Sequence, residues 1–436
     1  MAYHLSRPSL LSSENKTQPQ EGYRGILNLA VIIIIVTHLR LILENGRKYG
    51  VLLEWPHQLV SAGEANWTEW PVTALLLLCN VNILIALGIE NFAYSFPRTA
   101  PSDFAILVLN VINIAASLLV SASWIFFNST HSGGNMNPAK GIITLLCTIV
   151  CCFKLASYAL TNREVRRAHR KKIAPPPEAV GTTVADRPLI QYPANLTASN
   201  IYAFMCFPTL VYALNYPRSP RVRKRWLFRR IVEFFSLSII IVSMCEQWVL
   251  PTVRNANVHF DNLDVLMIFE RIMKLAIPNI YVWLVGFYVF FHVYLNIVAE
   301  LSRFGDRLFY RDWWNSRNLD YFWRTWNMPV HNFMKRHVYI PLRAAGWSQT
   351  ATVGLIFFIS AVGHEVILSV PFGTFKLWAF FGMLAQLPLC LLTRSSVTTH
   401  SQVGNVTFWI SILLGQPLLI LFYYRDFTAR GIVGAS

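Results

Sequence analysis

Long apolar runs separated by basic clusters constrain the fold of this chain more than any other feature. A membrane-spanning helix needs about 20 mostly apolar residues, and nine runs come close to this requirement. They lie at about residues 26–43, 71–88, 104–127, 141–160, 231–250, 275–297, 350–370, 377–392 and 406–423. Only 14% of the residues are charged, against about 25% in soluble domains. The sequence therefore predicts an all-α polytopic membrane protein with about nine transmembrane helices.

The basic residues predict how these spans are oriented. A formal charge of +16 is compatible with nucleic-acid binding, but the Lys and Arg residues gather between apolar runs, as the positive-inside rule requires. We therefore expect no nucleic-acid partner. Residues 23–160 hold spans one to four, residues 161–200 form a basic, Pro-rich, solvated cytosolic loop, and residues 201–436 hold spans five to nine. A polar N-terminal arm at 1–22 is then cytosolic, and the C-terminus is luminal.

Several kinds of chemistry have no counterpart in the sequence. The seven Cys residues lie in or beside apolar runs without metal-ligand spacing. We find no phosphate-binding loop, no G-x-S-x-G nucleophile elbow and no H-E-x-x-H motif. The sequence therefore predicts neither a bound metal, nor a covalent serine intermediate, nor a permanently bound cofactor.

The run Ser360–Pro371 places an imidazole and a carboxylate side by side in a predicted span. Ionisable groups are costly inside a bilayer, so such residues are candidates for function. His364 is a candidate general base, because neutral imidazole accepts a proton; the alternative is a buried histidine that only bonds a neighbouring helix. Adjacent helical residues point about 100° apart. We therefore expect Glu365 to contact another helix or to be protonated in place.

The segment 299–346 mixes aromatic and charged residues, as in FYRDWWN (Phe309–Asn315) and YFWRTWNMPVH (Tyr321–His331). It is compatible with an interfacial amphipathic segment or with the cytosolic wall of a pocket for a large anionic ligand. Two amides in the last spans, Gln386 and Gln416, are likewise open to two interpretations. They join helices or donate hydrogen bonds to a developing oxyanion.

These blocks, together with HEVILSVP (His364–Pro371), resemble the signature motifs of membrane-bound O-acyltransferases, in the branch that contains sterol and diacylglycerol acyltransferases. Within that branch NYPRSPRVRKR (Asn215–Arg225) and LWAFFGMLAQLPL (Leu377–Leu389) are most similar to the diacylglycerol enzymes. The resemblance runs from about residue 9 to residue 427. It implies an endoplasmic-reticulum enzyme that transfers a fatty acyl group from the co-substrate acyl-CoA to 1,2-diacylglycerol, as a homodimer or homotetramer.

The resemblance also implies roles for individual residues. His364, Asn327 and Glu365 match the catalytic positions, and Gln386 and Gln416 match the reaction chamber. The acyl-CoA site is expected at Phe309, Tyr310, Arg311, Asp312, Trp313, Trp314, Asn315, Trp326, Tyr339 and Arg343. The sequence departs from the family pattern at three places: Gly363 and Val366 stand where relatives commonly have bulkier aromatic residues, and Ile340 stands where a basic residue is common.

Two alternative functions remain open at this point. One is a sterol O-acyltransferase that makes steryl esters. The other belongs to a different class, a polytopic transporter whose intramembrane His and Glu relay protons. Many transporter folds are built from internal repeats, and we find none in this sequence, which counts against the second alternative.

Overall fold

The computed structural model describes residues 71–95, 103–131, 138–181, 188–256, 265–393 and 403–433. These residues form helices, with two isolated β-bridges. Six helices in the described ranges are long and apolar enough to cross a membrane. The predicted all-α membrane fold is therefore confirmed, whereas the predicted count of nine spans is not. The first predicted span, at 26–43, and the N-terminal arm lie outside the described residues.

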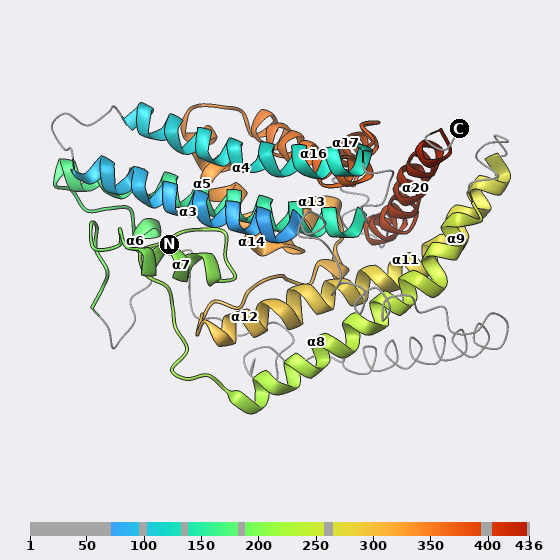
Figure 1. Ribbon diagram of the computed structural model, residues 1–436, viewed down its shortest axis with the longest axis horizontal. Helices are drawn as coiled ribbons and strands as arrows, with labels where there is room; N and C mark the ends of the chain where they lie inside the picture. Colours follow the sequence, from blue (N-terminus) through green and yellow to red (C-terminus); the bar gives the residue numbers. More distant parts are fainter. Residues whose placement is uncertain are drawn as a thin grey trace.

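One group of helices forms a bundle in the upper half of Figure 1. It comprises α3 (Pro71–Ser95), α4 (Asp103–His131), α5 (Pro138–Lys171), α16 (Gln349–Phe372) and α17 (Trp378–Leu384). Helices α3, α4 and α5 pack against one another, and α16 packs against α4 and α5. The outer positions carry exposed apolar side chains such as Leu77, Phe104 and Leu119. Such an outer surface is typical of helices that contact lipid.

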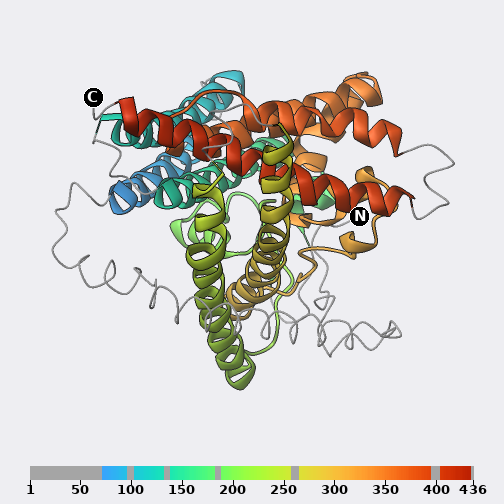
Figure 2. The same cartoon turned by 90° about the vertical axis from the view of Figure 1, so that its right-hand side faces the viewer.

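A second group extends away from this bundle (Figures 1 and 2). Helix α8 (Lys224–Met244) continues through the π-helical turn η3 (Cys245–Val249) into α9 (Leu250–Arg254), and α11 (Val265–Phe287) continues through η4 (Tyr288–Tyr294) into α12 (Leu295–Leu301). The two continuous helices lie side by side. Helix α20 (Val403–Val433) packs against both α11 and α17, and it thereby joins the two groups.

Two predicted spans differ from the structure. The fifth, at 231–250, lies within α8, η3 and α9, which are not among the six apolar spans. The first turns of α8 are rich in charge, with Arg229, Arg230 and Glu233 among them. The eighth, at 377–392, is divided into α17 and α18 (Gln386–Leu392). Pro388 has no backbone N–H to bond the carbonyl of Leu384, which accounts for this break.

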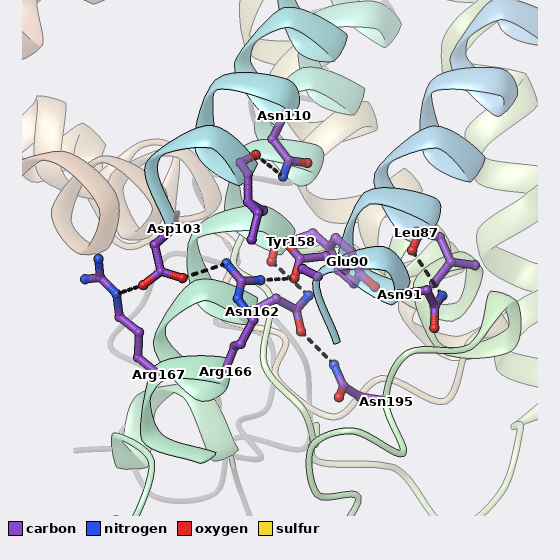
Figure 3. Close-up of polar contacts among 12 residues, drawn as sticks. Leu87, Glu90, Asn91, Asp103, Asn110, Tyr158, Asn162, Arg166, Arg167 and Asn195 are labelled. Atoms are coloured by element: carbon purple, nitrogen blue, oxygen red, sulfur yellow. Dashed lines mark hydrogen bonds and ion pairs between the residues drawn. The ribbon is translucent and has the colours of Figure 1, made fainter. Parts of the chain in front are cut away.

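The predicted solvated loop at 161–200 is wrong for its first part. Helix α5 continues to Lys171, and Arg166 is only 1% exposed. Its guanidinium is paired with Glu90 of α3 and lies 3.5 Å from Asp103 of α4, which also accepts from Arg167 at 2.6 Å (Figure 3). Buried charges persist when they are paired, and these two carboxylates supply the pairing.

The later part of the predicted loop is also folded. Helices α6 (Pro177–Val180) and α7 (Ala198–Cys206) flank a segment in which Asn195 is fully buried and donates to Asn162 of α5 (Figure 3). Lys154, inside α5, donates to the carbonyls of Phe204, Met205 and Phe207 at 3.0, 2.8 and 2.6 Å. The carbonyls of Phe204 and Phe207 also accept from the backbone N–H groups of Phe207 and Thr209. A cation at the C-terminal end of a helix is favourable, and these bonds fix α7 against α5.

Beyond α12 the motif segment folds into short helices: η5 (Trp313–Asn315), α13 (Leu319–Thr325), α14 (Met328–Met334), η6 (Lys335–Tyr339) and α15 (Ile340–Ala344). Glu300 fixes this segment to the preceding basic cluster, because its buried carboxylate accepts from the backbone N–H of Arg223 at 2.6 Å, from its guanidinium at 2.9 Å and from Arg307 at 2.5 Å. Arg223 is thus committed to a structural contact.

Candidate active site

His364 lies within α16, in a half-buried position. Its Nδ1 is 2.8 Å from the backbone carbonyl oxygen of Ser360, one turn earlier. A carbonyl oxygen can only accept, so Nδ1 carries the proton in this contact, and Nε2 of the neutral ring is left as an acceptor. A Cβ atom placed on the adjacent Gly363 would meet nothing within 4 Å. The contact with Ser360 therefore leaves Nε2 as the proton acceptor of the neutral ring, and there is open space at the neighbouring Gly363.

Glu365 faces a different set of helices from its neighbour. Its carboxylate accepts from the backbone N–H groups of Leu377 and Phe380 at 3.0 and 3.1 Å, from the hydroxyl of Tyr423 at 2.9 Å and from that of Ser369. Two donors reach each oxygen, which uses the acceptor capacity of an ionised carboxylate. Of the two predicted alternatives, contact with another helix is confirmed. Glu365 joins α16 to the start of α17 and to α20.

Asn327 is the N-cap of α14. Its side-chain carbonyl accepts from the backbone N–H of Val330 at 3.2 Å, a common arrangement because the first N–H groups of a helix have no partner within it. The cap fixes which end of the amide faces the helix. The Nδ2 donor has no acceptor among the described residues and is available to a ligand.

Gln416 is oriented in a comparable way on α20. Its carbonyl accepts from Nδ2 of Asn279, on α11, at 3.0 Å. Pro278 and Pro417 stand directly beside these two amides, inside their helices, and each removes a backbone N–H from the helical ladder. Because its carbonyl is occupied by Asn279, Gln416 also presents its N–H₂ group. Gln386 is half-buried and is the first residue of α18.

Helix α13, which directly precedes Asn327, contacts the elements that carry the other candidates. Its Trp323 ring lies 5.8 Å from Phe357 of α16, and its Phe322 ring lies 4.8 Å from Phe408 of α20. The backbone N–H of Leu319 donates to Thr393, just beyond α18, at 3.3 Å. The structure thus brings together the helices that hold His364, Gln386, Asn327 and Gln416.

The predicted acyl-CoA block divides into buried and accessible residues. Phe309, Tyr310 and Trp313 are each 2% exposed. The ring of Trp313 lies 4.9 Å from that of Phe287, and the hydroxyl of Tyr310 is 2.9 Å from Nδ1 of His292. These three side chains pack the block against α11 and η4 and present almost no surface to a ligand. Surface accessible to acyl-CoA remains on Arg311, Asp312, Trp314 and Asn315.

The other predicted acyl-CoA residues are spread along the motif segment. Trp326 is half-buried and its ring lies 5.6 Å from Phe291 of η4. Tyr339 is half-buried in η6. Arg343 is exposed at the end of α15, where it donates to the carbonyl of Trp347. All three side chains keep some exposed surface, so each can contact acyl-CoA.

Three cations, of which we predicted only Arg311 for the ligand site, act on His331, one turn beyond Asn327. Burial, together with the positive charges of Lys335, Arg324 and Arg311, lowers the pKa of His331 to about 4. All three cations are exposed, although Arg324 is paired with Asp320 at 2.7 Å. The i, i+4 spacing of His331 and Lys335 was visible in the sequence, but the approach of Arg311 depends on the fold.

Comparison with known proteins decides the family of this site. The model of the membrane-bound O-acyltransferase family matches residues 125–424. The chain belongs to this family. The match includes α16, α18, most of α20 and the whole motif segment. As a member of the membrane-bound O-acyltransferase family the chain is an acyltransferase, and the transporter alternative is excluded.

Individual relatives extend the similarity over nearly the whole chain. "Diacylglycerol O-acyltransferase 1" from Dictyostelium discoideum is 45% identical over 424 residues, which cover 97% of this chain and 64% of that protein. The human protein of the same name is 39% identical over 424 residues, covering 97% of this chain and 84% of that protein. "Diacylglycerol O-acyltransferase 1C" from Glycine max is 36% identical, with 98% and 80% covered. The chain thus spans slightly less than two thirds of the Dictyostelium protein.

Proposed function

We propose that this chain transfers a fatty acyl group from acyl-CoA to the hydroxyl of 1,2-diacylglycerol and so makes triacylglycerol. The names of its relatives support the substrates. The observation that carries the mechanism is the contact of His364 Nδ1 with the carbonyl of Ser360. It leaves Nε2 as the proton acceptor in an intramembrane position, where an ionisable residue is otherwise costly.

The reaction follows from this tautomer. The hydroxyl oxygen of diacylglycerol attacks the thioester carbonyl carbon while Nε2 of His364 takes the hydroxyl proton. The tetrahedral intermediate collapses, the carbon–sulfur bond breaks, and the CoA thiolate receives the proton from the imidazolium. Such general-base catalysis contributes about 10²–10⁴-fold. Transfer is direct, in a ternary complex, and no covalent enzyme intermediate is needed.

Two amides are suited to stabilise the intermediate. Asn327 and Gln416 each have the side-chain carbonyl occupied by an intramolecular donor, so each presents an N–H₂ group. Donors that are already oriented when charge develops on the oxygen lower the barrier without reorganisation. We assign the oxyanion to these two residues, with Gln386 lining the chamber.

The CoA phosphates are assigned to the cations near His331. Arg311 and Lys335 are exposed and act on His331, which lies one turn from Asn327, and phosphate oxygens form strong bonds with such groups. Arg223, in the basic cluster before α8, is held by Glu300, which reduces its availability to the phosphates. Trp314, Trp326 and Tyr339 supply aromatic surface for the rest of the acyl-CoA molecule.

The cellular arrangement is also proposed. The basic end of α5 is assigned to the cytosol by the positive-inside rule. The endoplasmic-reticulum location is taken from the family resemblance, and the cytosolic N-terminus and luminal C-terminus from the predicted order of the spans. Homodimers or homotetramers are expected from the family resemblance. Protease accessibility of epitope tags at both ends in sealed microsomes tests the topology, and light scattering of the purified protein tests the assembly.

The assay that tests the function uses the full chain in phosphatidylcholine nanodiscs with radiolabelled acyl-CoA and equal amounts of diacylglycerol and cholesterol. We expect labelled triacylglycerol, and His364→Ala should reduce it at least 100-fold. Gly354→Ala is the matched control, since it also lies in α16 and a Cβ there meets nothing within 4 Å. Labelled steryl ester would refute the acceptor, and near-normal turnover by His364→Ala would refute the base.

A further inference from the structure

A second polar site lies at the basic end of α5, apart from the candidate active site. A cavity of about 390 Å³ opens there, lined mainly by Tyr94, Ser95, Arg166, His169, Arg170 and Tyr192. These residues come from the end of α3, the end of α5 and the segment before α7. None of them belongs to the motif segment or to α16, so the proposed reaction does not account for the cavity.

Arg166 is a buried charged side chain in the wall of this cavity. It is 1% exposed, and its guanidinium lies between Glu90 and Asp103, as Figure 3 shows. Even so, its Nε–H has no acceptor among the described residues, and neither does the hydroxyl of Tyr192. Buried donors without acceptors are uncommon in folded proteins and cost about 1–3 kcal/mol each, so both donors favour a further acceptor at this site.

The charges around the cavity favour an anion. Three guanidiniums, from Arg166, Arg167 and Arg170, share the two carboxylates of Glu90 and Asp103, which leaves one positive charge in excess. The contacts of Arg170 are the weakest of the group: Nη1 is 3.6 Å from Asp103, and Nη2 is 3.2 Å from the carbonyl of Ala93. A phosphate oxygen binds a guanidinium at about 2.7–2.9 Å and would replace these long contacts.

The aromatic side chains give the cavity a second property. The rings of Tyr94 and Tyr192 meet edge to face at 6.0 Å, and His169 packs against Tyr192 at 5.3 Å. Burial raises the pKa of Tyr192 to about 12, so its phenol is a hydrogen-bond donor at neutral pH. Amphipathic rings beside cations are typical of the headgroup level of a membrane.

We propose that this cavity binds the phosphate of an anionic phospholipid, with Arg170, Arg166 and Tyr192 as donors. The phosphate neutralises the excess charge and connects the end of α3 to the end of α5. Inorganic phosphate offers the same chemistry from solution, and the experiment separates the two sources.

The test uses the full chain in nanodiscs of phosphatidylcholine alone or with 10% phosphatidylglycerol. Bound lipid is counted by native mass spectrometry, and the thermal midpoint is measured with and without inorganic phosphate. Arg170→Gln should weaken phosphatidylglycerol binding about tenfold, the effect of about one charge-assisted hydrogen bond, and Tyr192→Phe should weaken it less. Arg167→Gln is the matched control: it removes the same charge from the same helix and the same partner, Asp103, but does not line the cavity.

The outcomes distinguish the possibilities. Selective loss of phosphatidylglycerol in Arg170→Gln, with Arg167→Gln like the unchanged protein, supports the lipid site. Phosphate-dependent stabilisation that only Arg170→Gln loses, without bound phosphatidylglycerol, supports the site but assigns it to a soluble phosphate and refutes the lipid. Equal losses in both variants would show only a diffuse attraction of anions, and this result would overturn the proposal, as would binding of neither probe.

Discussion

Glu365→Gln tests whether this carboxylate acts in the chemistry or positions the helices around it. Each of its oxygens accepts two hydrogen bonds, one pair from Leu377 and Ser369 and the other from Phe380 and Tyr423. In glutamine an N–H₂ group, itself a donor, replaces one carboxylate oxygen. The two groups that donated to that oxygen then lose their acceptor. Bonds to a charged group contribute about 1.5–3 kcal/mol each, so the substitution should cost about 3–6 kcal/mol. Ser369→Ala, which removes one of the four donors, should cost about half as much.

The measurement compares thermal unfolding with activity on the same nanodisc samples. We expect Glu365→Gln to lower the midpoint about twice as far as Ser369→Ala does, because two bonds are lost rather than one. Activity per folded molecule should stay within about tenfold of normal, with an unchanged pH profile, because His364 keeps its own contact with Ser360. An unfolding curve that overlays that of the unchanged protein, combined with a loss beyond about 100-fold, would refute this reasoning and place Glu365 in the reaction.

Three further predictions rest on other contacts. Asn327→Ala should lower kcat far more than it raises the Kd for acyl-CoA; titration calorimetry beside steady-state kinetics checks this, and a purely affinity-based loss would contradict the oxyanion role. Acidification should destabilise the fold through His337: burial lowers its pKa to about 3, against about 6.5 unfolded. The unfolded chain then binds more protons, so stability falls as the pH drops from 6.5 toward 3. In the folded state the ring is 2.7 Å from the hydroxyl of Ser157. His337→Gln should flatten this dependence in melts between pH 8 and 5, and an equal slope would refute it. Finally, Ile340 is 41% exposed, and Ile340→Lys should tighten acyl-CoA binding; unchanged affinity would remove this position from the phosphate site.

The helices that were predicted well are those with a continuous apolar sequence. Continuous apolar character located both ends of α4 and α16 and the starts of α3 and α20 to within four residues, because a long apolar run has few alternatives to a spanning helix. The predicted spans end seven residues before α3 does and ten before α20 does, and α11 begins ten residues before its predicted span. The division of α17 from α18 was missed although Pro388 was visible, since proline inside a helix can kink the helix without ending it. The sequence therefore predicted the type of an element better than the residues at which it begins and ends.

Features that depend on distant partners could not be predicted. The helical continuation of α5 requires Glu90 and Asp103, which lie more than 60 positions before Arg166 and Arg167, so a run of cations looked like a solvated loop. The same limit applies to the site. Composition indicated that the block at 309–315 was aromatic, but not that Phe309, Tyr310 and Trp313 face inward against α11 and η4.

The two candidate amides show that the sequence can indicate which residues belong to a site but not which of their atoms face the ligand. Asn327 and Gln416 were singled out by position, yet which end of each amide is available depends on Val330 and Asn279. For Gln416 that partner lies 137 positions away. His364 is the exception, because its partner Ser360 is one turn away, and a local contact of this kind depends only on the helix.

Lys154 has a consequence for how the protein is made. Its three carbonyl partners, at Phe204, Met205 and Phe207, lie 50–53 positions further along the chain, so α5 is synthesised before any of them exists. At about 5–20 residues per second, the ammonium group waits roughly 3–10 s for its partners. During that time a nascent spanning helix carries a lysine without these three acceptors, which costs about 2.5–3.5 kcal/mol at the centre of a bilayer-spanning helix.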